Sequence, residues 1–304
     1  MQIIDAHHHL WCPVIDTAGI EYVWLKNIGA MKPFGDPTAI QRDYLPKEFA
    51  AESKKHELIA SIHLQADGAI PDPVKESQWL EYLGTVDPKL PSAHIGFVDL
   101  TLDNAEATLE RYFELPGFRG VRQILSRLDN RPNMSFAGEH FLRNPLWRQQ
   151  YHLLAKQNLS FDLQLYPEQM MEAAAFFSQH PDVPVIIDHA GSPYNQSIKG
   201  LVTLKYGLQA LAKLPHCHIK LCGFGMFDPD WSADSIDPIF EIILEAFGSK
   251  RMLFGSNYPV DKLMKGYDHL VDELLVCCVR HDLGQDDQNK IFSGNARDFY
   301  RLAL

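Results

Sequence analysis

Eight short apolar segments recur along the chain, and each is followed by a helix-like segment or a long loop. They are rich in Val, Ile, Leu or Phe and bounded by glycine, proline or polar residues, which is typical of strands buried on both faces. A strand followed by a helix eight times favours a closed parallel barrel. We therefore predict an α/β fold, a single-domain (β/α)8 TIM barrel over residues 1–304. The predicted strands span residues 2–7, 58–65, 93–100, 118–122, 159–164, 183–189, 217–222 and 251–257.

A doubly wound open sheet is the alternative to this barrel. Such a sheet normally carries a glycine-rich phosphate-binding loop after its first strand. Here that position holds three consecutive histidines, His7, His8 and His9. The length of 304 residues also suits one barrel, and no repeat, low-complexity tract or linker divides the chain.

Charge and composition argue against several classes of function. A formal net charge of −11 repels phosphate backbones, so we expect no nucleic-acid partner. No run reaches the roughly 18 apolar residues of a membrane span, so we expect no membrane partner. The five cysteines include no C-x-x-C pair, and their odd number is unsuited to a disulfide framework. We expect a cytoplasmic protein that acts on a small molecule, and the sequence leaves a homo-oligomer open.

The first predicted strand ends in the segment Asp5-Ala6-His7-His8-His9. Because alternate side chains of a strand share a face, we expect Asp5, His7 and His9 to point one way and His8 the other. Barrel enzymes build their active sites at the carboxyl ends of the strands. His7 and His9 would there hold one metal ion or one polarised carbonyl oxygen. Asp5, one layer deeper, would orient an imidazole.

Three other strand ends carry polar side chains suited to chemistry. His189 has the same parity as Ile187 at the end of the sixth strand, and Asn257 ends the eighth. Arg122 ends the fourth strand and offers a guanidinium fork for a carboxylate or carbonyl oxygen, or else forms a structural ion pair inside the barrel. The predicted catalytic residues are His7, His9, His189, Arg122 and Asn257.

Residues around these strand ends are candidates for substrate binding. His63 and Gln65 share a face at the end of the second strand, and Gln164 ends the fifth. A long aromatic-rich loop, about residues 10–37, is a candidate lid. Its tryptophans and Tyr258 suit either a pocket or the core. We also expect Asp162 and Lys220 to pair inside the barrel. The predicted substrate-binding set is Trp11, Trp24, His63, Gln65, Gln164, Tyr258 and Asp261.

Motifs spread over the whole chain are similar to those of the amidohydrolase-2 family. They are D-A-H-H-H-L-W, F-R-G-V-R, F-D-L-Q, I-I-D-H-A-G, I-K-L-C-G, L-F-G-S-N-Y-P-V and S-G-N-A-R-D-F-Y-R-L, in that order. The branch that the chain resembles includes sugar-acid lactonases and pyrone-dicarboxylate lactonase. This resemblance implies a distorted TIM barrel and a hydrolase that opens a lactone of a sugar acid or related small carboxylic acid.

The resemblance also assigns roles to individual positions. The first-strand histidines of the family match His7 and His9, its sixth-strand histidine matches His189, and its fourth-strand arginine matches Arg122. The general-base aspartate of the family falls on Asn257, whose amide cannot take up a proton. The base must then lie elsewhere, with Asp261 or His189 as candidates, while Asp188 has the wrong parity. Two alternatives stay open: a metal-dependent decarboxylase-like enzyme, and a binding barrel without catalysis.

The metal content is the last expectation from the resemblance. Three neutral imidazoles, His7, His9 and His189, suit a single zinc ion. Members of the branch also work without metal, so the sequence leaves this cofactor open. Arg122 stands where two-metal relatives place a carboxylated lysine, so a two-metal centre is not expected. No organic cofactor is expected.

Overall fold

The centre of the computed structural model, which describes residues 1–14, 19–66, 68 and 70–304, is a parallel sheet. Its eight strands lie side by side in chain order, β1 to β8. This confirms the predicted strands, although six of them end earlier than expected. The strands are β1 (Gln2–His8), β2 (Glu57–Leu64), β3 (Ala93–Gly96), β4 (Phe118–Arg122), β5 (Ser160–Leu163), β6 (Val185–Ile187), β7 (Cys217–Leu221) and β8 (Met252–Phe254).

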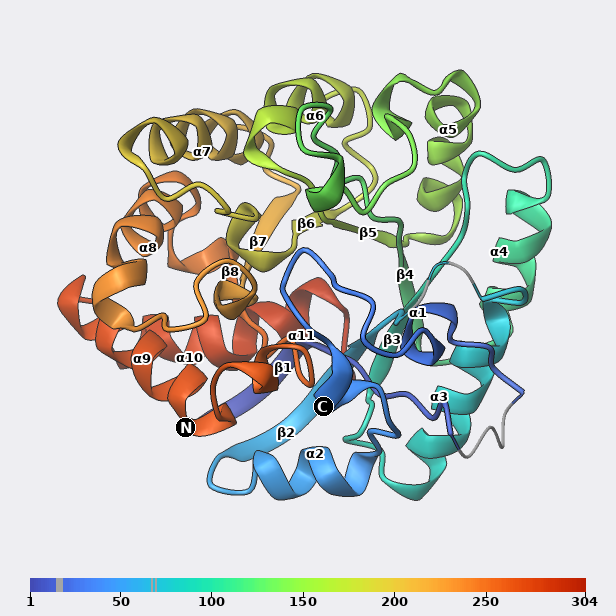
Figure 1. The fold of residues 1–304 in the computed structure, drawn as a ribbon, viewed down its shortest axis with the longest axis horizontal. Helices are drawn as coiled ribbons and strands as arrows, with labels where there is room; N and C mark the ends of the chain where they lie inside the picture. Colours follow the sequence, from blue (N-terminus) through green and yellow to red (C-terminus); the bar gives the residue numbers. More distant parts are fainter. Residues whose placement is uncertain (15–18, 67, 69) are drawn as a thin grey trace.

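Helices surround this ring of strands (Figure 1). Local sequence sets their ends: the side chain of Asn144 accepts hydrogen bonds from the amides of Leu146 and Trp147 at the start of α5. Gly248 ends α8 with a φ of 62°. The helices are α1 (Val23–Lys26), α2 (Pro46–Glu52), α3 (Val74–Val86), α4 (Ala105–Phe113), α5 (Pro145–Gln150), α6 (Met170–Phe177), α7 (Ile198–Ala212), α8 (Ala233–Phe247), α9 (Tyr267–Arg280), α10 (Gln285–Asn289) and α11 (Asn295–Phe299). In the described part of the chain, none of them combines the length and apolar character needed to cross a membrane.

The ring closes between β1 and the segment that follows β8. The amide of Asn257 donates to the carbonyl of His7, and the amide of His9 donates to the carbonyl of Tyr258, both at 2.7 Å. The architecture is therefore the predicted (β/α)8 barrel. This closure places the chain after β8 directly beside the histidines of β1.

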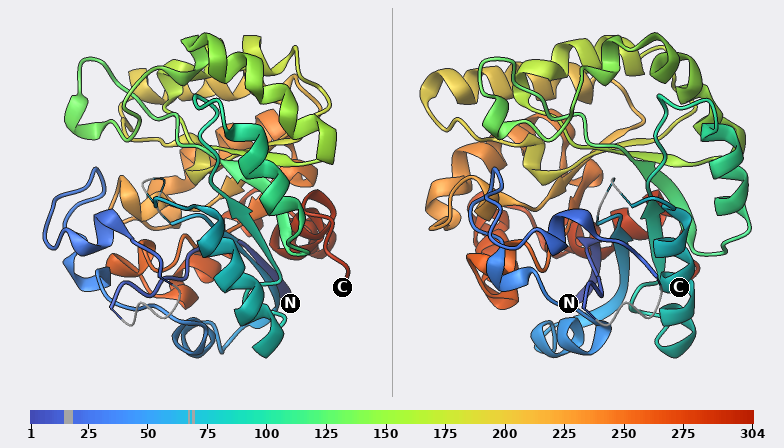
Figure 2. Two further views of the ribbon diagram at one scale, coloured as in Figure 1. Left: turned by 90° about the vertical axis from the view of Figure 1, so that its right-hand side faces the viewer. Right: turned by 45° about the vertical axis from the view of Figure 1, so that its right-hand side comes forward.

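Apolar side chains fill the barrel away from these histidines. Ile4, Ile62, Ile186 and Leu253 belong to one buried cluster that also contains Tyr300, next to α11. A second, larger cluster lies between the sheet and the helices and includes Ile187. The loop after β1 lies at the opposite end of the molecule from both termini (Figure 2). The carboxyl ends of the strands are thus the end of the barrel at which polar side chains gather.

Candidate active site

A cavity of about 400 Å³ lies at the carboxyl ends of the strands. This volume is in the range of pockets for small molecules. Six aromatic side chains line it: Trp11, Trp24, Phe34, Phe97, Phe136 and Phe141. The predicted lid, about residues 10–37, supplies three of these aromatic side chains as well as Lys32; its residues 15–18 lie outside the described part. The loop is therefore a wall of the cavity, and its movement as a lid stays a prediction.

The three predicted histidines converge beside this cavity. The ring centroid of His7 lies 5.2 Å from that of His9 and 4.6 Å from that of His189. His8 points away and stacks on Phe49 of α2 at 4.5 Å. The expected convergence of the three rings, and the opposite direction of His8, agree with the structure. His9 and His189 line the cavity, while His7 lies beneath them.

Asp5 does not share the face of His7, because the pairing of β1 with β2 is irregular between Asp5 and His8. An irregularity of this kind breaks the alternation of side chains. One oxygen of Asp5 accepts from the amides of His7 at 3.1 Å and Ser256 at 2.9 Å, and the other accepts from Tyr267 of α9 at 3.2 Å. Burial raises the pKa of Asp5 to about 6. The expectation that Asp5 orients an imidazole was wrong: it holds the backbone of β1.

Asp188 lies at the centre of the site, contrary to the parity argument. Its Oδ1 lies 3.3 Å from Nδ1 of His7 and 2.9 Å from Nζ of Lys220, and its Oδ2 lies 3.1 Å from Nε of Arg122. Ile186 faces the barrel interior, so Asp188 continues the inward face of β6. His189 was expected inward because it matches Ile187, but Ile187 faces the helices. His189 reaches the site because β6 ends at Ile187 and the chain turns there, with a φ of 54° at His189.

Two carboxylates and two cations form a buried network under the cavity. Lys220 pairs with Asp162, as predicted, and Tyr300 donates to the same oxygen of Asp162 at 2.7 Å. Arg122 donates to the side chain of Gln164 and lies 3.4 Å from Nε2 of His189. Burial opposes ionisation of Asp188, yet Lys220, His7 and Arg122 hold its pKa well below the ordinary value. The structural ion pair considered for Arg122 is therefore present, and its guanidinium also lines the cavity.

Burial keeps the imidazoles of the site neutral. It lowers the pKa of His7 and His9 well below the ordinary value, with Lys220 and Arg122 adding to the effect. Burial also lowers the pKa of His189 to about 3, and Arg122 contributes although Asp188 opposes it. Neutral rings can accept a proton, donate one hydrogen bond or bind a metal.

Two glycines make room for these rings. A Cβ on Gly223 would lie 2.5 Å from Nδ1 of His189, and Gly223 has a φ of 71° that other residues rarely adopt. A Cβ on Gly255 would lie 2.7 Å from Cβ of His7. Both glycines therefore allow the rings to approach the ends of β7 and β8.

Asn257 lines the cavity, and the carboxyl group of Asp261 lies behind its side chain. Its Nδ2 donates to Oδ1 of Asp261 at 3.2 Å, and the amide of Gly223 donates to Oδ2 of Asp261 at 3.1 Å. Asp261 is buried and is not part of the cavity wall. Burial raises the pKa of Asp261 to about 7 despite these hydrogen bonds.

The predicted substrate-binding residues divide into two groups. Trp11, Trp24, Gln65 and Gln164 line the cavity, whereas His63, Tyr258 and Asp261 do not. His63 accepts from the amide of Leu10 at 3.0 Å, and its other nitrogen lies 3.7 Å from Glu76 of α3. It faces outward because Ile62 and Leu64 take the inward positions of β2. Tyr258 donates to the carbonyl of Lys265 at 2.8 Å. These three side chains are therefore outside the cavity wall, and their contact with substrate stays a prediction.

The sequence reasoning missed Asp99, Gln123 and Lys32, which also line the cavity. Asp99 follows the end of β3 by three residues, and Gln123 directly follows β4. Their positions just after strand ends are the signal that could have found them. Lys32 lies in an irregular loop, and no pattern in the sequence marks it.

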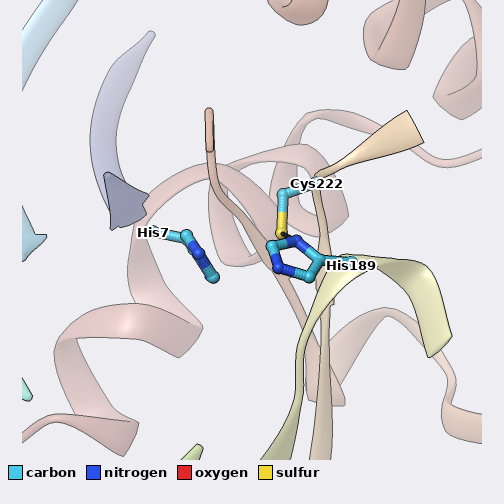
Figure 3. A group of neighbouring side chains, drawn as sticks. All are labelled: His7, His189 and Cys222. Atoms are coloured by element: carbon cyan, nitrogen blue, oxygen red, sulfur yellow. Dashed lines mark hydrogen bonds between the residues drawn. The ribbon is translucent and has the colours of Figure 1, made fainter. Parts of the chain in front are cut away.

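A group of three side chains could hold a metal ion, but its membership differs from the prediction. The donor atoms of His7, His189 and Cys222 lie within 4.8 Å of one another (Figure 3). Nδ1 of His9 instead lies 2.8 Å from the carbonyl of Leu64, and His9 is not in this group. Within the described residues, Nε2 of His7 is buried without a hydrogen-bond partner, as a free donor atom would be. Two imidazoles and a thiol suit zinc, so the residues present fit such an ion.

The surroundings of this group set conditions on a cation. Burial raises the pKa of the Cys222 thiol well above its ordinary value. Lys220 lies 3.4 Å from His7, and Arg122 lies 3.4 Å from His189. A metal ion would therefore have to displace the thiol proton and rely on the nearby carboxylates to offset two positive charges.

Comparison with known proteins shows the family of the chain. The amidohydrolase family model matches residues 4–302, and the chain belongs to that family. The uncharacterized protein y4mH of Sinorhizobium fredii is 32% identical, with 99% of this chain and 98% of that protein covered. An L-fucono-1,5-lactonase of Burkholderia ambifaria is 27% identical, with 98% and 95% covered. The crystal structure of a zinc-bound amidohydrolase of Burkholderia multivorans superposes with a TM-score of 0.80 at 25% identity, with 99% and 100% covered.

Proposed function

We propose that this amidohydrolase opens lactones of sugar acids or related small carboxylic acids. The observation that carries the proposal is the position of Arg122, His9 and His189 together in the wall of one small, aromatic-lined cavity. A guanidinium and neutral imidazoles can polarise an ester carbonyl and stabilise the oxyanion that forms from it. Relatives named L-fucono-1,5-lactonase and L-rhamnono-gamma-lactonase support this chemistry.

The reaction requires the addition of water to the lactone carbonyl. Arg122 binds the carbonyl oxygen, and Asp188 keeps its guanidinium in place through the contact at Nε. Without a metal ion in the site, His189 accepts the proton of the water, since it lines the cavity. The charge of Arg122 lowers the pKa of His189, so that ring becomes a stronger base when the developing oxyanion offsets this charge. His189 then returns the proton to the ring oxygen that leaves.

The amide of Asn257 does not act as a base in this scheme. Its Nδ2 is committed to Asp261, which leaves its carbonyl oxygen to accept a hydrogen bond from the water. Asp261 therefore acts through the orientation of Asn257 and not through contact with the substrate.

A ring that binds a metal ion has no free lone pair for a proton, so His189 acts as the base only in the metal-free site. We propose zinc as the cofactor of a second state of the site, held by His7, His189 and Cys222. When bound, it would supply Lewis acidity to the carbonyl oxygen. Arg122 lies next to His189, so binding and orientation of the substrate by Arg122 do not depend on the ion.

A panel of lactones tests the function. We expect the purified protein to hydrolyse five- and six-membered sugar-acid lactones well above the spontaneous rate, measured by acid release. Turnover of an aromatic or unsaturated acid with carbon dioxide release, and of no lactone, would contradict the proposal and favour a decarboxylase. Binding of lactones without turnover would favour a binding barrel.

A further inference from the structure

Asp99 is a carboxylate in the cavity wall whose orientation is set by three donors. Its Oδ1 accepts from the amide of Thr101 at 2.9 Å, from Oγ1 of Thr101 at 2.7 Å and from Nε2 of Gln123 at 3.0 Å. Among the described residues, no hydrogen bond to Oδ2 is found. Asp99 therefore has one anchored oxygen and one available oxygen at the cavity.

Gln123 gives this arrangement a rigid support. Its Oε1 accepts from Nε1 of the buried Trp147 at 2.8 Å and from the amide of Leu100 at 3.2 Å. Because both of these groups are donors, the amide nitrogen of Gln123 must face Asp99. Gln123 directly follows Arg122, so the carboxylate is tied to the same strand end as the guanidinium.

The available oxygen determines what the wall can bind. An ionised carboxylate is an acceptor only, and it takes one or two hydroxyl groups well, in short charge-assisted hydrogen bonds. It repels another carboxylate, and an alkyl group there would leave it buried without a partner. Aromatic side chains of the same cavity can cover the apolar faces of a sugar ring.

We infer that Asp99 is a specificity residue that binds the ring hydroxyls of an uncharged, hydroxyl-rich lactone. This inference rests on the proposed function and narrows it. Arg122 holds the carbonyl end of the substrate, and Asp99 holds its hydroxyl end. Lactones that carry a second carboxylate, and lactones without hydroxyls, are then poor substrates.

The test is Asp99→Asn, which preserves the size of the side chain and an oxygen for Thr101 and Gln123. The variant and wild type are compared on D-glucono-1,5-lactone and on δ-valerolactone, which has the same ring and no hydroxyls. We expect kcat/KM for the sugar lactone to fall about tenfold to a hundredfold, mainly through KM, because a charge-assisted hydrogen bond is lost. The kcat/KM of the variant for δ-valerolactone should stay within about twofold of the wild-type value. Asp103→Asn removes the same charge from an exposed position of the same loop and is the matched control.

Two outcomes of the lactone comparison overturn the inference. An equal fall on both lactones would show that Asp99 only supports the fold, and no fall on either would show that its oxygen is not used.

Binding of D-glucono-1,5-lactam and δ-valerolactam, measured by calorimetry, separates this inference from the proposed function, because lactams resist hydrolysis. If no lactone is turned over but Asp99→Asn selectively loses the sugar lactam, the lactonase proposal fails and the binding role of Asp99 stands. If the sugar lactam binds equally to both proteins, the binding role fails.

Discussion

Nδ2 of Asn257 donates a hydrogen bond to Oδ1 of the buried Asp261 at 3.2 Å. This contact joins the residue that lines the cavity at the end of the barrel to a carboxylic acid with a pKa of about 7. The carboxyl group that the family resemblance places at residue 257 is absent there, and another lies one side chain behind it.

Asn257→Asp places two carboxyl groups within hydrogen-bond distance. Each raises the pKa of the other, so the pair retains a proton to higher pH. We expect lower activity near neutral pH and a pH–rate profile displaced to higher pH, measured as kcat/KM between about pH 5 and about pH 9. The backbone should tolerate the change, because the φ of 55° at residue 257 is accessible to Asp as well as Asn.

Asn104→Asp adds the same charge at an exposed position and serves as the control. A large gain in activity in Asn257→Asp, with wild type near background, would refute this prediction and support a binding protein that had lost its base.

Asp261→Asn tests the raised pKa of Asp261 through stability. The pKa is about 7 in the folded protein, against an ordinary value of 3.8, so the folded state binds more protons between these values. Stability from this group is therefore largest at low pH and declines as pH rises toward 7, by at most about 1.4 kcal/mol per pH unit. We expect a smaller decline in the variant, measured by urea unfolding at about pH 5 and about pH 7. Parallel profiles for the two proteins would show that Asp261 ionises normally.

Arg122→Lys keeps the positive charge and removes the planar fork. Lysine cannot contact Asp188, Gln164 and the substrate carbonyl at the same time. We expect kcat/KM on the best lactone to fall about a hundredfold or more, with near-native stability by thermal melting. Arg143→Lys alters a surface arginine that pairs with Glu172 at 2.9 Å and is the control. Unchanged kinetics in Arg122→Lys would assign Arg122 a structural role only.

Cys222→Ser tests the proposed zinc site. A hydroxyl is a much weaker zinc ligand than a thiolate, so we expect zinc affinity to fall at least about tenfold in a chelator competition. Cys217→Ser alters a buried cysteine outside the donor group, at the start of the strand β7 that Cys222 directly follows, and its zinc affinity should match wild type. Equal loss in both variants, or no zinc bound to wild type, would remove zinc from the proposed site.

Asp188→Asn leaves two buried cations without their shared partner. Lys220 and Arg122 both contact this carboxylate, so the free energy of unfolding should fall by about 3–5 kcal/mol. Glu106→Gln breaks the exposed pair with Lys156 and should change the free energy of unfolding by less than about 1 kcal/mol. The measurement is urea unfolding at one pH. Similar small effects in both variants would show that the network tolerates the loss of its central charge.

Local sequence was sufficient to predict the eight strands, because strands buried on both faces are continuous apolar runs between turn residues. It also predicted the convergence of His7, His9 and His189, since strand ends of a parallel barrel meet at one end. The pairing of Asp162 with Lys220 followed from their matching inward positions on β5 and β7.

Only the tertiary structure determined where side chains lie once the alternation of a strand stops. The irregular pairing of β1 turned Asp5 toward Tyr267, and the early end of β6 let both Asp188 and His189 enter the site. Cys222 replaced His9 in the metal-binding group because Nδ1 of His9 lies against the carbonyl of Leu64. The cavity wall around Asp99 depends on a contact with Gln123, which follows the next strand of the barrel, as well as on the local contact with Thr101. A period of two holds only while a strand is regular, so the residues just past its end are placed by packing and hydrogen bonds that only the folded chain forms.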